Sequence, residues 1–199
     1  MRSRICFIVL LAGTFWFCAP SHSATTNGPV RDSETPERLR AAVAANFREP
    51  FAKLSEHYQR SGGDTVQAVF GSSGMLSAQI QQGAPFDLFF SADSERPHDL
   101  VISGHASGKP FTYARGRLAL WMPGGAQGMA VDPETAVAGR FALANPKLAP
   151  YGRAARECLQ SMKLWAQARD RAVYGNNISQ TYHFIASRGV AAGFIAFSQ

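Results

Sequence analysis

The sequence predicts an α/β protein built on a doubly wound sheet. Short apolar runs of strand length alternate along the chain with segments in which apolar residues recur at helical spacing. One run, Asp87–Phe90, is apolar almost throughout, which is typical of a strand in a parallel sheet covered on both faces. With 199 residues, 46% of them hydrophobic and 17% charged, the chain is long enough for one large domain or two small lobes. This composition excludes disorder and a collagen-like structure.

Residues 1–23 are predicted to be a cleavable secretory signal. Arg2 and Arg4 precede an apolar stretch, Ile5–Phe17, and small residues follow it. The stretch has 13 residues, whereas a membrane span needs about 20. A lipid anchor at Cys18 and a retained membrane anchor remain alternatives, although the bulky residues before Cys18 disfavour a lipid anchor. Cleavage removes two arginines and no acid, which lowers the formal net charge from +6 to +4.

The next residues, 24–37, are rich in Thr, Ser, Pro, Asn and Gly and are predicted to be a flexible leader. Signal cleavage leaves Cys158 as the single cysteine, which cannot form an internal disulfide. Cys158 lies between Ala155 and Met162 in a helical pattern, so we expect a buried apolar side chain rather than a nucleophile.

The first half of the mature chain is predicted to contain three strands with a helix after each of the first two. The strands are Leu39–Ala45, Thr65–Phe70 and Asp87–Phe90. Asn46 stands three residues before Glu49, the spacing of an N-cap, and predicts the start of the first helix. The second helix follows a Gly-Ser-Ser-Gly turn and ends at Gly83.

The second half repeats this alternation. The predicted strands are Leu118–Met122, Phe141–Ala144, Ala172–Tyr174 and Gly193–Phe197, and the predicted helices are Tyr151–Met162 and Ile178–Ser187. Asn177 or Asn176 is the expected cap of the second of these helices.

Four strand-to-helix junctions are the candidate functional elements. They are Ala45-Asn46, Ser72-Ser73, Pro150-Tyr151-Gly152 and Asn177-Ile178. In an α/β sheet such junctions gather at the carboxyl ends of the strands, where ligands bind. Helix N-termini offer unpaired N–H groups and a partial positive charge, so several that converge make an anion site without Lys or Arg. Alternatively, these residues are ordinary caps and packing residues, because the sequence alone does not show that the junctions converge.

Motifs of enzymes and metal sites are missing from the sequence. Gly71-Ser72-Ser73-Gly74-Met75 lacks the second glycine of G-x-S-x-G, which disfavours a hydrolase that uses Ser73. The five histidines show no metal-ligand spacing, and no phosphate loop or dinucleotide fingerprint occurs. The positive charge is spread thinly, so no nucleic-acid partner is predicted. A binding protein is therefore favoured over an enzyme.

A set of short motifs carries a resemblance that extends from Leu39 to Gln199. The motifs are Ala44-Ala45-Asn46-Phe47, Gly71-Ser72-Ser73-Gly74, the segment 83–93, Phe111-Thr112-Tyr113-Ala114, Gly116-Arg117-Leu118, Asn145-Pro146, Ala149-Pro150-Tyr151-Gly152 and Gly193-Phe194-Ile195-Ala196. In order and spacing they resemble the periplasmic molybdate-binding proteins of ABC transporters, the ModA family.

The resemblance implies a type II periplasmic binding protein fold, in which two α/β lobes joined by a hinge hold a tetrahedral oxyanion. Lobe I is expected at 38–114 and lobe II at 115–199. The implied ligand-binding residues are Ala45, Asn46, Ser73, Tyr151 and Ile178, the last through its backbone N–H. The resemblance thus implies that the protein binds the oxygens of molybdate and not the molybdenum directly. The residues that it implies for this contact are Asn46, Ser73, Tyr151 and Ile178. No catalytic residue and no cofactor is implied.

The resemblance further implies a monomeric periplasmic protein that captures molybdate or tungstate and delivers it to an ABC permease and its ATPase. Binding of another tetrahedral oxyanion, such as sulfate or phosphate, and a sensor without a transport role remain alternatives. Members of the family continue for several tens of residues beyond the strand at Gly193–Phe197. The expected return of the chain to lobe I is therefore missing, and we expect uncovered apolar surface and low stability in that lobe.

Overall fold

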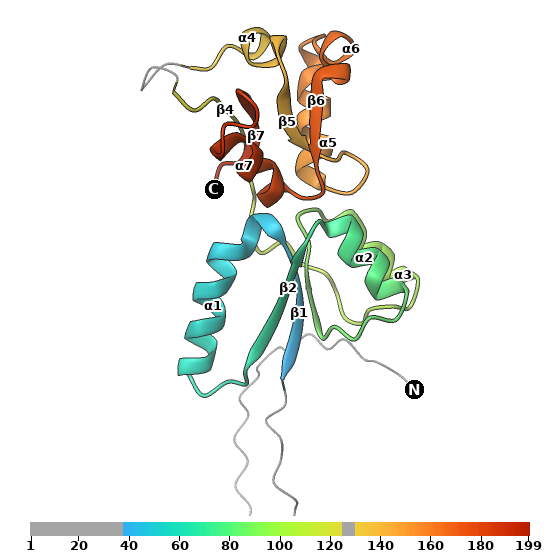
Figure 1. Cartoon of the computed structure of the whole chain (residues 1–199). Coiled ribbons are helices and arrows are strands. Elements are labelled where there is room, and N and C mark those ends of the chain that lie inside the picture. Colours follow the sequence, from blue (N-terminus) through green and yellow to red (C-terminus); the bar gives the residue numbers. More distant parts are fainter. Residues whose placement is uncertain (1–37, 125–129) are drawn as a thin grey trace, which may run out of the picture.

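The strands form two separate sheets, one in each half of the chain, in a computed structural model that describes residues 38–124 and 130–199 (Figure 1). The predicted signal and leader, residues 1–37, lie outside the described residues. We call the part built on the first sheet lobe I and the part built on the second sheet lobe II. The boundary between the lobes was predicted at residues 114 and 115. These residues follow the last helix of lobe I and precede the first strand of lobe II, and the boundary stays a prediction.

Lobe I contains a parallel sheet covered on both faces by helices (Figure 1). Its elements are β1 (Leu39–Ala44), the 3₁₀ turn η1 (Ala45–Phe47), α1 (Arg48–Arg60), β2 (Val66–Gly71), α2 (Ser73–Gln81), β3 (Leu88–Phe90) and α3 (Glu95–Ile102). The strand order is β2-β1-β3, and β1 pairs in parallel with both neighbours.

The side chains of the central strand β1 alternate between the two faces of this sheet. Val43 packs with Phe51 of α1 on one face. On the other face Ala42 packs with Leu76 of α2 and Leu100 of α3. Because successive side chains of a strand point to opposite sides, a strand buried on both faces carries apolar residues on both. The sequence predicted such a strand at Asp87–Phe90, whereas the structure places β3 half-buried at the edge of the sheet and buries residues of the central strand β1 on both faces.

Lobe II contains a mixed sheet. Its strands are β4 (Leu118–Trp121), β5 (Phe141–Ala144), β6 (Ala172–Gly175) and β7 (Ala192–Ala196), in the order β4-β7-β5-β6. Strand β5 is parallel to β6 and β7, whereas the edge strand β4 runs antiparallel to β7. Antiparallel edge strands are common on otherwise parallel sheets, and nothing in the local pattern of β4 indicated its direction.

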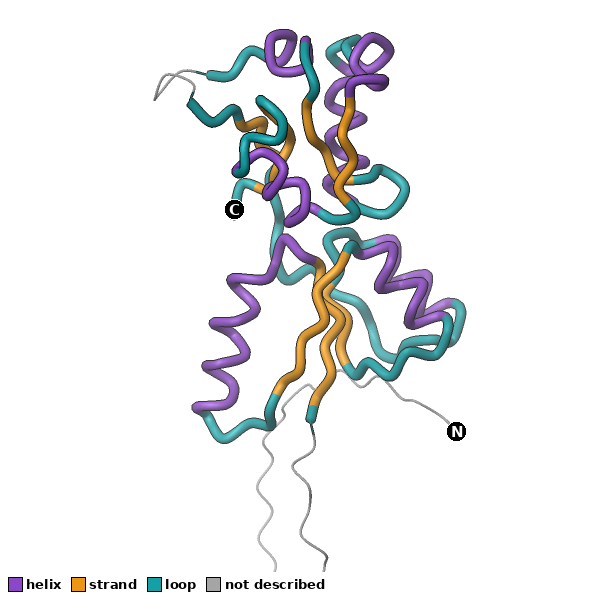
Figure 2. Tube along the Cα trace, in the orientation of Figure 1, coloured by secondary structure: helices purple, strands orange, loops and turns teal. Residues whose placement is uncertain are grey.

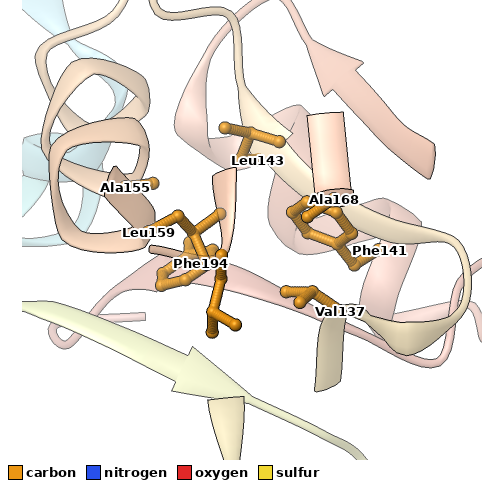
Figure 3. Packing of buried hydrophobic residues seen from close by; sticks show 8 residues of the cluster. Val137, Phe141, Leu143, Ala155, Leu159, Ala168 and Phe194 are labelled. Carbon is orange, nitrogen blue, oxygen red and sulfur yellow. The ribbon is translucent and has the colours of Figure 1, made fainter. Parts of the chain in front are cut away.

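The core of lobe II lies between its sheet and its helices (Figure 3). The helical elements are α4 (Pro133–Ala138), α5 (Pro150–Ser161), α6 (Trp165–Ala168), η2 (Arg169–Arg171) and α7 (Ile178–Ala186). Phe141, Leu159 and Phe194 are buried in one cluster, and each such side chain contributes about 1.5–3 kcal/mol on burial. Cys158 packs half-buried against this cluster, which agrees with the predicted packing role.

Three local predictions differ from the structure. Asn46 caps no helix, because residues 45–47 form the 3₁₀ turn η1 and α1 begins only at Arg48 without a side-chain cap. Ser72 rather than Ser73 caps α2, by accepting a hydrogen bond from the N–H of Met75 at 3.4 Å. The helices α3, α4 and α6 have too few apolar positions for a periodic signal, and the sequence did not predict them. Asn177 caps α7 as predicted.

Lobe II sits over the carboxyl ends of the β1 and β2 strands of lobe I, and the two lobes touch (Figure 2). The N–H of Gly74 in lobe I donates to the carbonyl oxygen of Leu148 in lobe II at 2.9 Å. The Ser179 hydroxyl of lobe II donates to the carbonyl oxygen of Ala45 at 3.3 Å. The structure is therefore a form in which the lobes are closed on one another.

Some apolar surface of lobe I is exposed, at Val69, Ile102 and Phe111. The low stability expected of lobe I stays a prediction. Within residues 38–124 and 130–199, no helix combines the length and the apolar character that crossing a membrane requires.

Candidate functional site

A small pocket lies between the two lobes, where the carboxyl ends of their strands face one another. It is lined by Ala44, Ala45, Asn46, Gly71, Ser72, Ser73, Ala92, Ala149, Pro150, Tyr151 and Ile178. All five predicted binding residues, Ala45, Asn46, Ser73, Tyr151 and Ile178, are in this set, so the structure brings the four junctions together. Their role in binding stays a prediction.

The pocket is small and its described lining is uncharged. Its volume is about 10 Å³, roughly the space that one water molecule needs. Pockets for drug-sized molecules measure about 300–1,000 Å³. The site is therefore far too small for an organic molecule of that size, and any ligand in it meets only neutral groups.

The turn η1 presents Ala45 and Asn46 to the pocket directly after β1. Asn46 caps no helix, so its side-chain amide is not bonded to a helix N-terminus. The amide instead forms a hydrogen bond with the side chain of Tyr151 in lobe II. Ala45 is buried, and its carbonyl oxygen accepts the hydrogen bond from Ser179. This turn therefore supplies an amide group to the pocket and contacts lobe II at two places.

The N-terminus of α2 presents Ser73, which is fully buried. Its hydroxyl oxygen accepts a hydrogen bond from the N–H of Ala92 at 2.9 Å. A serine hydroxyl has one proton to donate besides its acceptor sites, and this bond uses an acceptor site. The O–H proton of Ser73 can therefore be given to an oxygen atom in the pocket.

Lobe II contributes the first residues of α5 and α7. Pro150 and Tyr151 begin α5, and Ile178 begins α7. The first N–H groups of a helix have no acceptor within the helix, so the N–H groups of Tyr151 and Ile178 can bind a ligand. The start of α5 lies close to the end of β5. Gly152 is required there because a Cβ at this position would overlap the carbonyl oxygen of Ala144.

Two tyrosine hydroxyls near the pocket are held in the neutral form. Burial raises the pKa of Tyr151, although its hydrogen bond to Asn46 acts in the opposite direction. Burial, followed by the charge of ionised Tyr151, raises the pKa of Tyr113 to about 12. Tyr113 donates a hydrogen bond to the carbonyl oxygen of Ser91 at 3.0 Å. At neutral pH both side chains are therefore hydroxyl donors.

Sequence reasoning missed three neighbours of these residues. Ala92 lines the pocket and fixes Ser73 from the loop after β3. Tyr113 and Gly116 lie in the connection between the lobes, and a Cβ on Gly116 would overlap the hydroxyl of Tyr151. The sequence contained a signal for all three, because they fall within motifs that carry the resemblance, but their contacts join distant segments.

The arrangement suits anion binding rather than catalysis or metal ligation. The N-termini of α2, α5 and α7 meet at the pocket, and each carries about half a positive charge. The described lining contains no His, Asp, Glu or Lys that could activate Ser73 as a nucleophile. Within the described part of the chain, no group of three or more His, Cys, Asp or Glu side chains is placed to hold a metal ion.

The chain resembles known solute-binding proteins. A family model described as bacterial extracellular solute-binding protein matches residues 39–199. The molybdate-binding protein ModA of Rhodobacter capsulatus is 43% identical over 164 residues, which are 80% of this chain and 64% of that protein. ModA of Azotobacter vinelandii is 38% identical over 167 residues, which are 81% of this chain and 65% of that protein. The chain thus spans slightly less than two thirds of these relatives.

A solved structure of the periplasmic molybdate-binding protein of Azotobacter vinelandii is similar to this chain, with a TM-score of 0.70 and 34% sequence identity. The similar region covers 79% of this chain and 71% of that chain. The fold of this chain is therefore shared with that structure over the similar region.

Proposed function

Because the chain belongs to the bacterial extracellular solute-binding proteins, in the group of the ModA molybdate-binding proteins, we propose that it captures molybdate or tungstate between its lobes. The observation that carries this proposal is the convergence of three helix N-termini and the turn η1 on one uncharged pocket. Such a pocket favours a small anion over a cation or an organic molecule.

The groups that would bind the ion are neutral donors from both lobes. Lobe I offers the hydroxyl of Ser73 and the amide of Asn46, and lobe II offers the hydroxyl of Tyr151 and the N–H of Ile178. Hydrogen bonds from such donors to an ionised oxygen are shorter and stronger than those between neutral groups. Because the donors belong to both lobes, the ion itself links the lobes in the closed form.

The size of the pocket bears on which anion is held. Molybdate and sulfate are both doubly charged tetrahedra, so charge does not distinguish them, and the distance between the donors of the two lobes does. The pocket is small, about 10 Å³, so the spacing of the donors leaves little tolerance for an ion of the wrong size. The ion that sets this distance best is held most tightly.

The biological setting follows from the family and from the predicted N-terminal signal. We propose that residues 1–23 direct the protein to the periplasm and that the monomer delivers its ion to an ABC permease and its ATPase. Periplasmic binding proteins close their lobes around a ligand by a hinge movement, so the closed form is the one that would carry the ion to the permease.

Calorimetric titration of the purified chain with molybdate, tungstate, sulfate and phosphate tests the proposal. We expect tight binding of molybdate and tungstate and much weaker binding of the other two ions. Replacing Ser73 by alanine should weaken molybdate binding about 10- to 100-fold, because one hydrogen bond to a charged group is lost. Ser77→Ala is the matched control, since Ser77 is a buried serine of the same helix outside the pocket. Tight binding of sulfate without binding of molybdate would refute the proposal.

A further inference from the structure

A cluster of charged side chains bridges the two lobes beside the pocket. In lobe II, Arg153 extends from α5 toward the start of α3 in lobe I. Its Nη1 donates to Oε2 of Glu95 at 2.7 Å, and its Nη2 lies 3.5 Å from Oδ2 of Asp93. These are ion pairs between residues 58 and 60 positions apart in the sequence. They exist only while the lobes are in contact.

Lobe I holds one carboxylate of this cluster in a fixed place. Asp93 forms an ion pair with Arg96, and its Oδ1 accepts hydrogen bonds from the Ser91 hydroxyl at 3.1 Å and the N–H of Arg96 at 3.2 Å. Its side chain is only 9% exposed. Asp93 is therefore a preformed acceptor toward which Arg153 can close.

Glu95 is the more exposed carboxylate of the cluster, with 61% of its side chain accessible to solvent. The hydrogen bond from Arg153, and then the charge of Arg153, lower the pKa of Glu95. Arg153 also experiences the charges of Asp93 and Glu157. Glu95 therefore gains its stabilising partner from the opposite lobe.

Short connections join this cluster to the pocket. Asp93 directly follows Ala92, which lines the pocket and donates its N–H to Ser73. Arg153 stands two residues after Tyr151 on the first turns of α5. A movement of lobe II as a body that parts Arg153 from Asp93 and Glu95 therefore also opens the pocket.

We propose that Arg153, Asp93 and Glu95 form a latch that holds the lobes closed and slows release of the bound ion without contacting it. This inference rests on the proposed function. Interactions present only in the closed form shift the population toward that form, and a ligand enclosed there leaves more slowly. The two carboxylates balance Arg153 and Arg96, so the latch adds no net charge that would attract other anions.

The test compares release of molybdate from the full chain and from Arg153→Gln, measured by rapid mixing with excess tungstate as competitor. We expect about 3- to 10-fold faster release from Arg153→Gln with an unchanged association rate, as for a partly exposed ion pair. The difference should shrink at about 1 M salt, where charges are screened beyond about 3 Å. Arg169→Gln is the control, because the ion pair that Arg169 forms with the described residues is with its neighbour Asp170 on the same lobe.

A charge exchange separates the latch from a simple packing effect. In the double variant Glu95→Arg with Arg153→Glu, the pair between positions 95 and 153 is restored with reversed polarity, although Asp93 repels the new carboxylate. Release from the double variant should therefore be slower than from Arg153→Glu alone. Release from Arg153→Gln at the rate of the unchanged protein would overturn the proposal, as would a double variant no slower than Arg153→Glu.

Hydrogen exchange at the Gly74 amide gives a readout that does not need the ion. This amide donates to the carbonyl oxygen of Leu148 across the lobes, so it should exchange faster in Arg153→Gln than in the unchanged protein. If the unchanged protein binds no oxyanion, the proposed function fails, and the Gly74 comparison alone decides whether the latch exists. Equal exchange in both proteins would then show that it does not.

Discussion

Replacing Gly74 by alanine should weaken ion binding while leaving lobe I at least as stable as before. Gly74 lies in the first turn of α2, where its backbone meets Leu148 of lobe II. A Cβ at this position would stand 2.6 Å from the carbonyl oxygen of Leu148, whereas ordinary contact begins at 3.4 Å. The lobes must therefore part by about 0.8 Å at this point, a difference obtained from the two distances.

A separation of this size is large relative to a hydrogen bond. Moving a donor by about 0.8 Å from a normal distance of roughly 2.9 Å takes it beyond 3.5 Å, where little of the bond remains. Loss of one hydrogen bond to the ion costs about 1.5–3 kcal/mol, which is about a 10- to 100-fold increase in Kd. Alanine also has the higher helix propensity by about 1 kcal/mol, so folding itself is not weakened.

The assay is calorimetric titration with molybdate together with urea unfolding of the same samples. Gly139→Ala is the matched control, because a Cβ on Gly139 has no atom within 4 Å and its backbone is not in the left-handed region. A Gly74→Ala protein that binds molybdate as tightly as the unchanged protein would refute the reasoning. Close approach of the lobes would then not be what holds the ion.

Two further predictions concern the tyrosines. Gly116→Ala should weaken molybdate binding and leave the melting temperature nearly unchanged, because the new Cβ displaces the Tyr151 hydroxyl. Calorimetry should show that adding Tyr151→Phe to Gly116→Ala causes no further loss of molybdate affinity. The free energy of unfolding should fall as the pH rises from about 10 to about 12, since folded Tyr113 keeps its proton to about 12 whereas the unfolded chain releases it near 10. Urea unfolding across this range should show a smaller fall for Tyr113→Phe.

The α/β class and the periplasmic binding protein fold are confirmed, because strands buried on both faces leave a strong local signal. Phe141–Ala144 was predicted with its exact bounds, as β5 is fully buried and bounded by polar turns. Short helices such as α4, Pro133–Ala138, leave no periodic pattern, and their position depends on packing. The direction of β4 depends on its partner β7, about 75 positions later in the sequence, which no local pattern encodes.

Some residues of the candidate site could likewise be predicted from the sequence, whereas others could not. The junction residues Ser73 and Ile178 could be predicted, because strand-to-helix junctions are visible in the sequence and must lie at the carboxyl ends of strands. The position of Asn46 at the pocket was predicted for the wrong local reason, since it caps no helix and instead contacts Tyr151. Gly116 falls within a motif that carries the resemblance, but its contact with Tyr151 and the ion pairs of Arg153 could not be predicted, because these contacts exist only once the two lobes meet.

The absence of charge in the described lining of the pocket is what makes discrimination by size physically reasonable. A lysine or arginine in the pocket would attract every anion by a charge interaction that falls off slowly with distance and tolerates misfit. Hydrogen bonds from the hydroxyls of Ser73 and Tyr151 lose their strength within about half an ångström of misplacement. The positive charges of Arg153 and Arg96 are neutralised by Asp93 and Glu95, and Arg153 acts between the lobes rather than on the ion. Ion selectivity and closure are thus assigned to different groups, so release can be tuned at Arg153 without changing which ion fits.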